Sequence, residues 1–299
     1  MDLATLLGTR ELVVVTGKGG VGKTAVAGAI ALALHGRGRR VLVLEADPRE
    51  SLHQLLGTAP SAGEVVPVRP GLWLQNLQPR RVVERIVHRR IPIAPLARAF
   101  TSSPVFGHFV EGSPGLKEMA LLGQAVELAS GVEGPGVDTV VLDAPATGHG
   151  LQLLAAPRLV TAAIGGGPLG ELAAQVDALV ADAARSAIVA VALAEELPVA
   201  ETLELLAALR SRVGREPALV VANQVYPPVP VEAAGVDGAL GPALDLWRRR
   251  RAMNERELGR LRGAWHGAFA ELPLLAEVRG PALAAALAAR LEAALGGPQ

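Results

Sequence analysis

The eight residues from Gly17 to Thr24 constrain the fold of this chain more than any other segment. They fit the pattern G-x-x-x-x-G-K-[ST], between an apolar β-branched run, Leu12–Thr16, and a helix-favouring stretch, Thr24–Leu34. Glycines in such a loop let backbone N–H groups surround a phosphate, and the helix adds the partial positive charge of its amino end. The sequence therefore predicts a strand, a phosphate-binding loop and a helix in succession.

Two side chains of this loop have specific expected roles. Lys23 should reach the β- and γ-phosphates of a nucleotide, and the Thr24 hydroxyl should bind Mg²⁺. Only three of the 29 basic residues are lysines, and two of them, Lys18 and Lys23, lie in this loop. We therefore expect ATP and Mg²⁺ as cofactors. The expected nucleotide-binding residues here are Gly17, Gly19, Gly20, Val21, Gly22, Lys23, Thr24 and Ala25.

Further apolar runs alternate with Ala- and Leu-rich stretches that are typical of helices. These runs are Val41–Glu45, Thr139–Leu142, Ile188–Leu193, Leu219–Ala222 and Phe269–Leu274. Several are apolar throughout, a pattern typical of strands buried on both faces of a parallel sheet. The sequence predicts an α/β fold with a doubly wound, mainly parallel sheet.

Two regions fit the alternation of strands and helices poorly. Residues of about 76–130 and about 151–184 are mostly helical in pattern and flank the segment 138–149. We interpret residues 1–299 as one P-loop domain with a helical subdomain assembled from these two regions beside the sheet. Ordinary crossover helices are the alternative interpretation.

Composition excludes several classes of function. The chain has 29 basic and 29 acidic residues, so we expect no nucleic-acid partner, which would require a charge surplus. It contains no cysteine, which excludes disulfides, thiolate catalysis and cysteine-held zinc. Because neither a signal peptide nor a transmembrane stretch is evident, we expect a cytoplasmic location.

Two carboxylates follow predicted strands that should end near the phosphate loop. Asp47 comes after the run Val41–Glu45, where it could orient or deprotonate the attacking water and contact the metal. Asp143 follows Thr139–Leu142, as a metal-binding aspartate does in P-loop enzymes, and could hold Mg²⁺ through water. From the residues alone, the expected catalytic residues are Lys23 and Asp47, and the expected metal-binding residues are Thr24, Asp47 and Asp143.

The loop sequence with its early lysine resembles the deviant P-loop of one ATPase superfamily. That superfamily includes nitrogenase iron protein, the septum-site and chromosome-partition ATPases and the arsenical-pump ATPases. The resemblance implies that Lys18 contacts nucleotide across a dimer interface, where it would act on the transferring phosphate as an arginine finger does.

The segments after the strands resemble the arsenical-pump and tail-anchored-protein-targeting ATPase family. Its switch I reads D-P-A-H-S-L, and this chain keeps that pattern except at Arg49 and Glu50. Its switch II reads D-T-A-P-T-G-H, which 143–149 match with one residue shuffled. The resemblance implies that the switch residues are Asp47, Pro48, Asp143, Thr147, Gly148 and His149.

Weaker resemblances to the same family continue along the chain. They lie at residues 72–79, 114–118 and 196–202, the last resembling the segment before the next helix. Asn223 and Gln224 resemble the pair that reads adenine, since an amide can both donate to and accept from a base edge. Pro273 and Leu274 match a late loop whose backbone lies near the base.

Departures from the family limit what the resemblance implies. Without cysteine, we expect neither arsenite binding nor the zinc that closes the dimer of many targeting factors. The three methionines are too few for a methionine-rich client groove. An amphipathic stretch, Arg80–Leu96, could still be a partner-binding face or a plain solvated helix.

Three functional hypotheses remain. The first is an ATP-hydrolysing dimeric switch, which would couple nucleotide state to binding of a hydrophobic protein or membrane partner. The alternative is an assembly or regulatory subunit with little or no hydrolysis, either a homodimer or a heterodimer with a paralogous ATPase. A small-molecule kinase or cofactor-maturation enzyme ranks last, because residues 80–130 offer no obvious acceptor site.

Overall fold

The computed structural model describes residues 2–47, 50–90, 95, 98, 101–103, 115–131, 134–145, 149–164, 167–229, 241–275 and 278–296. Within these residues the strands are β1 (Leu12–Gly17), β2 (Val41–Glu45), β3 (Val66–Arg69), β4 (Leu72–Asn76), β5 (Thr139–Asp143), β6 (Ser186–Leu193), β7 (Leu219–Val225) and β8 (Phe269–Pro273). The helices are α1 (Leu3–Leu7), α2 (Lys23–Gly36), α3 (Leu52–Leu56), α4 (Pro79–Arg90), α7 (Leu116–Ala129), α8 (His149–Ile164), α9 (Gly167–Ala181), α10 (Glu196–Ala208), α11 (Gly241–Ala264) and α12 (Gly280–Gly296). A short π-helical turn, η1 (Leu209–Val213), continues α10.

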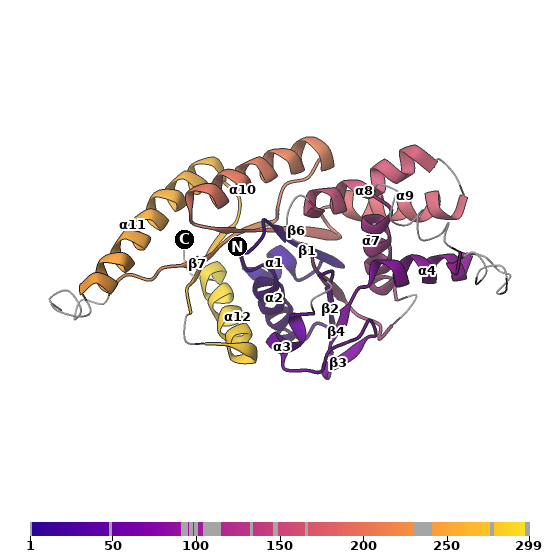
Figure 1. Cartoon of the computed structure of the whole chain (residues 1–299), viewed down its shortest axis with the longest axis horizontal. Coiled ribbons are helices and arrows are strands. Elements are labelled where there is room, and N and C mark those ends of the chain that lie inside the picture. The colour runs from indigo at the N-terminus through magenta and orange to yellow at the C-terminus, as the bar shows by residue number, and fades with distance from the viewer. Residues whose placement is uncertain are drawn as a thin grey trace.

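The strands described form one eight-stranded sheet in the order β3-β4-β2-β5-β1-β6-β7-β8 (Figure 1). Every neighbouring pair is parallel except β3 with β4. The doubly wound, mainly parallel sheet predicted from the sequence is therefore confirmed. Because β1 lies between β5 and β6, the phosphate loop after β1 emerges in the middle of the sheet, at the carboxyl ends of the strands.

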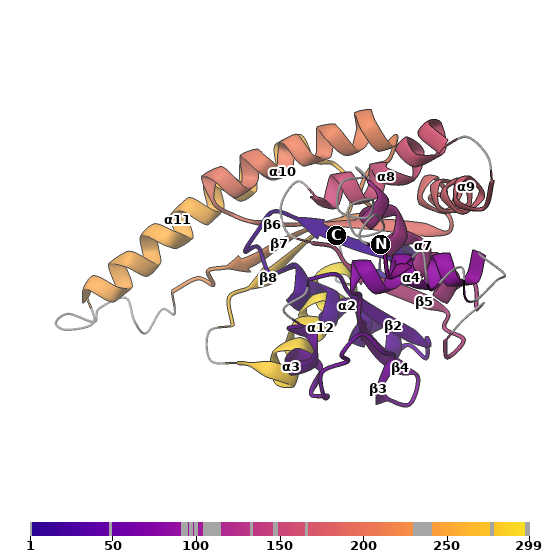
Figure 2. The same cartoon turned by 45° about the vertical axis from the view of Figure 1, so that its right-hand side comes forward.

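Alternate residues of the central strands are buried in two different apolar clusters, one on each face of the sheet. In β1, Leu12 and Val14 belong to one cluster, and Val13 and Val15 belong to the other. Helices α1, α2, α3 and α12 cover the second face, and the remaining helices cover the first (Figures 1 and 2). This two-sided burial explains why the strands are apolar throughout instead of alternating with polar residues.

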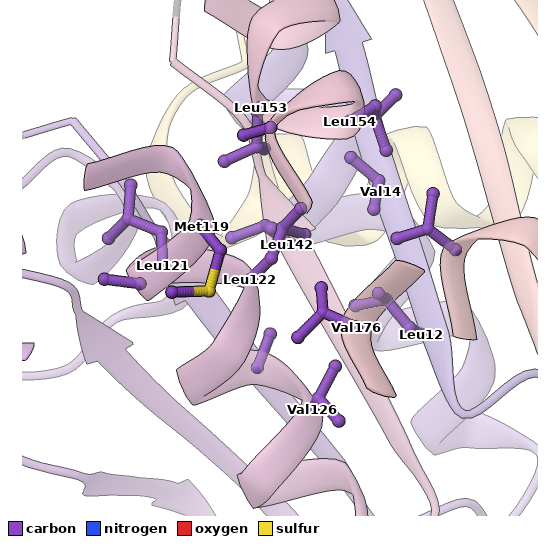
Figure 3. Close-up of a cluster of buried hydrophobic side chains, with 14 of the residues drawn as sticks. Leu12, Val14, Met119, Leu121, Leu122, Val126, Leu142, Leu153, Leu154 and Val176 are labelled. Carbon is purple, nitrogen blue, oxygen red and sulfur yellow. The ribbon is translucent and has the colours of Figure 1, made fainter. Parts of the chain in front are cut away.

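Helices α4, α7, α8 and α9 pack against one another and share a single core with one face of the sheet. Figure 3 shows the centre of this core, where Leu122 of α7, Leu153 of α8 and Val176 of α9 surround strand residues. Burying each such side chain contributes about 1.5–3 kcal/mol. A separate helical subdomain stays a prediction. In the structure these helices form a layer on the sheet and share one apolar core with it.

The structure departs from the sequence analysis at two places, one a missed strand and the other a wrong expectation. Strand β3 was not predicted, because it is a short antiparallel edge strand with only partly buried and exposed residues and with Pro67 inside it. The segment 196–202 is not a lead-in to a helix, since α10 already begins at Glu196. Proline does not oppose this start, because Pro198 lies in the first helical turn, where its missing N–H has no partner to lose.

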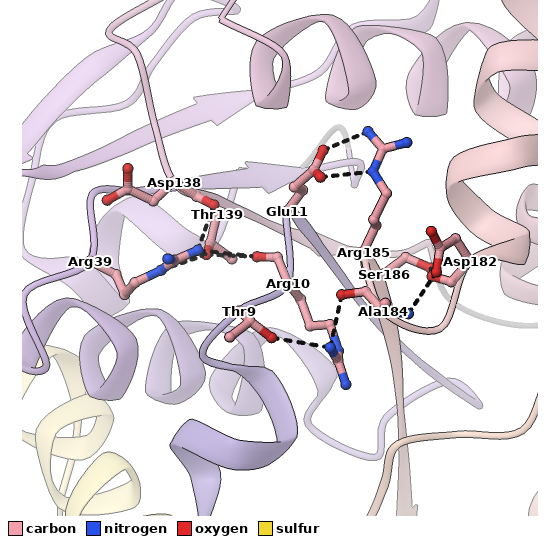
Figure 4. A network of polar contacts seen from close by, with 10 residues as sticks. All are labelled: Thr9, Arg10, Glu11, Arg39, Asp138, Thr139, Asp182, Ala184, Arg185 and Ser186. Atoms are coloured by element: carbon pink, nitrogen blue, oxygen red, sulfur yellow. Dashed lines mark hydrogen bonds and ion pairs between the residues drawn. The ribbon is translucent and has the colours of Figure 1, made fainter.

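A polar network ties together the amino ends of the central strands (Figure 4). The guanidinium of Arg39, in the turn before β2, donates to the Asp138 carbonyl at 2.7 Å and to the Thr139 hydroxyl at 2.9 Å. Arg185 forms two hydrogen bonds with the Glu11 carboxylate, at 2.7 and 2.8 Å. The network lies at the end of the sheet opposite the phosphate loop, so we assign it to stability.

Replacing Arg39 with alanine should lower the free energy of unfolding by about 1.5–3 kcal/mol, because the buried acceptors would lose a charged donor. Arg37 is the matched control, since its surface ion pair with Glu292 should contribute less than about 1 kcal/mol. Urea unfolding of the two alanine variants measures both values. Equal losses for Arg37→Ala and Arg39→Ala would contradict the stabilising role of the network.

Candidate nucleotide-binding site

The loop from Gly17 to Gly22 has a backbone that only glycine adopts easily at its ends. Gly17 has φ +150° and Gly22 has φ +86°. A Cβ at Gly17 would overlap the carbonyl oxygen of Val191, and one at Gly22 would overlap the Asn223 amide. Glycine is therefore favoured at both positions for two reasons: the backbone has a positive φ there, and β6 and β7 approach the loop too closely for a side chain.

Lys23 opens helix α2, and its side chain is folded back into the loop. Its ammonium donates to the Lys18 carbonyl oxygen at 3.0 Å, and the residue is only 7% exposed. Burial lowers the pKa of Lys23, and the negative charges of Asp143 and Asp47 oppose that shift. The ammonium therefore lies within the field of both carboxylates predicted to flank the nucleotide.

Thr24 and Asp143 meet although they come from different elements. The Thr24 hydroxyl, in the first turn of α2, donates to one carboxylate oxygen of Asp143, at the end of β5, at 2.6 Å. The other carboxylate oxygen of Asp143 is buried and has no hydrogen-bond partner among the described residues. A hydroxyl beside an unsatisfied carboxylate oxygen fits Mg²⁺, which prefers oxygen ligands.

The charge of Asp143 is unfavourable in the metal-free chain. Burial raises its pKa to about 7, with smaller contributions from Glu45 and Asp47, although the Thr24 hydrogen bond and Lys23 oppose the shift. The folded chain therefore binds more protons than the unfolded chain between about pH 4 and about pH 7. This group's contribution to stability is complete below that window and is lost as the pH rises through it.

Asp143→Asn should therefore flatten the pH dependence of stability. In EDTA, the melting temperature of the wild-type chain should fall more between about pH 5 and about pH 8 than that of the variant, because asparagine has no charge to bury. Differential scanning fluorimetry measures both slopes. Parallel slopes would mean that Asp143 does not titrate in this window.

Asp47 lies two residues beyond the end of β2, whose last residue, Glu45, pairs with Asp143 of β5. The N–H of Ala46 donates to the Asp143 carbonyl at 3.3 Å, and the Asn76 amide donates to the Asp47 carbonyl at 2.6 Å. Glu45, which is 1% exposed, accepts hydrogen bonds from the N–H groups of Ser51 and Leu52. Sequence reasoning missed Glu45 and Asn76, although both lie at strand ends that face the loop.

The residues expected to read adenine lie at the ends of β7 and β8. The Asn223 amide donates to the Val21 carbonyl at 2.9 Å, so it supports the phosphate loop directly. Gln224 is exposed at φ +56°, and the Leu274 N–H donates to the Val225 carbonyl at 2.9 Å. These contacts bring Asn223, Gln224, Pro273 and Leu274 to one side of the loop, where adenine recognition stays a prediction.

Lys18 has a partner in its own chain that the sequence did not indicate. Its ammonium lies 3.2 Å from a carboxylate oxygen of Glu201 on α10, and the two side chains are 32% and 29% exposed. Both residues line a cavity of about 290 Å³ between the loop, α8 and α10. A partly exposed ion pair of this kind is weak, about 0–1 kcal/mol, so another partner can replace it.

Both switch segments are described only in part. Pro48 of switch I and Thr147 and Gly148 of switch II lie outside the described residues, as does the side chain of His149, the first residue of α8. Gly150 packs so closely against Thr16 that an added Cβ would overlap the Thr16 hydroxyl. The start of α8 is therefore in direct contact with the strand that leads into the phosphate loop.

Comparison with known proteins gives a consistent set of relatives. The sequence model described as anion-transporting ATPase matches residues 10–166. The chain is 31% identical over 212 residues to ATPase BagA of Mycobacterium tuberculosis, covering 65% of this chain and 59% of the relative. It is 30% identical over 145 residues to a putative arsenical pump-driving ATPase 2 of Aquifex aeolicus, covering 48% of each.

A plant relative matches at a similar level. ATPase GET3B of Arabidopsis thaliana is 27% identical over 173 residues, covering 52% of this chain and 42% of the relative. The chain thus matches less than two thirds of the length of these relatives. Among the described helices, none combines the length and apolar character that crossing a membrane requires.

Proposed function

The chain belongs to the anion-transporting ATPase family, and from that premise we propose that it hydrolyses ATP as a nucleotide-gated dimer. In this proposal the nucleotide state controls binding of a hydrophobic protein or a membrane partner. The relatives named as ATPases and as an arsenical pump-driving ATPase support the hydrolysis. The chain itself has no cysteine, so arsenite and zinc form no part of the proposal.

One observation carries the hydrolytic proposal, namely the Thr24–Asp143 hydrogen bond beside the buried ammonium of Lys23. Bound Mg²⁺ would neutralise charge on the β- and γ-phosphates. Thr24 and Asp143 would hold that ion, and the backbone N–H groups of the loop and Lys23 would hold the phosphates. Asp47 would accept a proton from the attacking water or orient it.

The dimeric part of the proposal depends on Lys18. In the single chain its ammonium pairs with Glu201, and about a third of each side chain remains open to solvent. A second chain that offered a nucleotide phosphate would be a stronger partner than a partly exposed carboxylate. We propose that Lys18 exchanges Glu201 for the partner's nucleotide, which ties dimer closure to ATP.

The position of α8 supports the proposed coupling to a partner. This helix begins directly after switch II, contacts Thr16 through Gly150, and is buried in the same core as α7 and α9. A change in switch II would therefore act on the whole helical layer. A hydrophobic client on this layer, and the cytoplasmic location, remain predictions.

Phosphate release from Mg-ATP tests the proposed function most directly. The purified chain should release phosphate at a saturable rate, and excess EDTA should lower that rate to background because Thr24 and Asp143 would have no ion to hold. Restoring Mg²⁺ should restore the rate. Tight ATP binding without phosphate release would overturn the hydrolytic proposal and favour the assembly or regulatory subunit.

A further inference from the structure

We propose that Asn76 is a positioning residue that holds switch I in place, so that Asp47 faces the nucleotide. The inference rests on the proposed function, because it assigns to Asp47 the catalytic contact and to Asn76 the support of that contact. Asn76 is the last residue of β4, and β4 pairs with β2, the strand that leads into switch I. Its side chain is 2% exposed.

The contact between Asn76 and Asp47 is direct. The Asn76 amide donates to the Asp47 carbonyl oxygen at 2.6 Å, and the same oxygen accepts the N–H of Glu50 at 3.4 Å. A buried amide–carbonyl bond in a low-dielectric surrounding is costly to leave unmade. The backbone of Asp47 is therefore fixed from the sheet, and with it the direction in which its carboxylate leaves the chain.

The other described end of switch I is held by the same group of residues. One carboxylate oxygen of Glu50 accepts the N–H of Ser61 at 3.0 Å, and the Ser61 hydroxyl accepts the N–H of Asn76 at 2.8 Å. We call Glu50, Ser61 and Asn76 the switch clasp. Glu50 has φ +38°, an uncommon value for a residue with a side chain, which persists only where surrounding contacts hold it.

The switch clasp gives a reason for one departure from the family pattern. The family pattern of switch I has histidine where this chain has Glu50. A carboxylate at that position can accept the N–H of Ser61. The chain thus uses Glu50 to anchor switch I to the loop before β3. Along the chain, Asp47 lies between this anchor at Glu50 and the backbone contact of Ala46 with Asp143, so it is held from both sides.

Displacing a catalytic group by about 1 Å can cost on the order of a hundredfold in rate. Asn76→Ala should therefore lower kcat on the order of 10- to 100-fold, while the KM for ATP and the affinity for a fluorescent ATP analogue stay within about twofold. Rates are divided by the concentration of sites that bind the analogue, so that partial unfolding cannot imitate the effect.

Gln75→Ala is the matched control. Gln75 is the preceding residue of β4, is equally buried at 2% exposed, and donates its amide at 2.9 Å to the carbonyl of Gly63 instead of that of Asp47. Both variants lose one amide–carbonyl hydrogen bond of a buried side chain and similar volume, so their melting temperatures should fall by similar amounts. Only Asn76→Ala should lower kcat, and Gln75→Ala should stay within about twofold of wild type.

The outcomes separate the two proposals. Equal kcat values for the two variants, with an active wild-type chain, would overturn the positioning role and leave the proposed hydrolysis intact. A loss of ATP affinity in Asn76→Ala as large as its loss of kcat would also overturn it, because the residue would then support binding. A wild-type chain that binds ATP without hydrolysing it would overturn the proposed function and the positioning role together.

Discussion

Asp47→Asn should lower the rate of ATP hydrolysis by about a hundredfold or more, because a positioned general base contributes on the order of 10²–10⁴ to such a reaction. Asparagine has the same shape and keeps the backbone carbonyl that Asn76 holds. The affinity for ATP should therefore stay within about threefold of wild type. Phosphate-release kinetics and titration with a fluorescent ATP analogue give the two values.

Asp138→Asn provides the control for this substitution. Asp138 lies at the amino end of the sheet, where it pairs with Arg40 at 2.9 Å, and it is remote from the loop. Its replacement should leave turnover unchanged even if it costs some stability. A similar rate for Asp47→Asn and wild type would mean that another group activates the water.

The same Asp47→Asn chain should accumulate whatever assembly ATP induces. Light scattering with Mg-ATP should give the mass of a dimer, and without nucleotide the mass of a monomer, since ATP that is not hydrolysed keeps the closed state populated. A chain that binds ATP but stays monomeric would indicate that a different protein, such as a paralogous ATPase, supplies the second half of the site.

Lys18→Ala should reduce hydrolysis even more strongly, by about 10³–10⁵ if its ammonium acts as an arginine finger does. ATP binding should be largely retained, because Lys23 and the backbone of the loop stay in place. Lys117→Ala, which removes the third lysine of the chain from α7, should leave the rate unchanged. A minor loss in Lys18→Ala would contradict a role for this lysine on the transferring phosphate.

Mixing the two inactive chains tests whether Lys18 acts across the interface. In a mixed dimer, the Lys18→Ala chain keeps its own Asp47 and receives Lys18 from the Asp47→Asn chain, so one complete site forms. Random pairing of equal amounts should recover about a quarter of wild-type activity, because about half of the dimers are mixed and each holds one complete site. No recovery would mean that Lys18 acts within its own chain.

The parts of this structure that could be predicted from sequence are those written in local patterns. Glycine spacing predicts the phosphate loop, and uninterrupted apolar runs such as those of β1 and β5 predict the central strands. Strand β3 could not be found this way, because an edge strand needs little burial. The missed strand lies at one edge of the sheet, so missing it does not change the predicted position of the loop.

Contacts between distant segments could be predicted only where a motif already named both partners. Thr24 and Asp143 were each expected near the metal, and the structure brings them within hydrogen-bond distance. The Lys18–Glu201 and Asn76–Asp47 contacts had no such signal, because they depend on how α10 and β4 are placed relative to the loop. Register and helix packing decide them, and neither is readable from a single sequence.

In the proposed dimer, Glu201 of the same chain competes with the nucleotide of the second chain for the ammonium of Lys18. Glu201 is tethered to the same chain, so its effective concentration near Lys18 stays constant however dilute the protein is, whereas a second chain becomes scarce on dilution. At low abundance the intramolecular pair would prevail, and each chain would hold its nucleotide idle. Because the pair is worth only about 0–1 kcal/mol, Glu201 would raise the chain concentration at which the dimer forms by a modest factor.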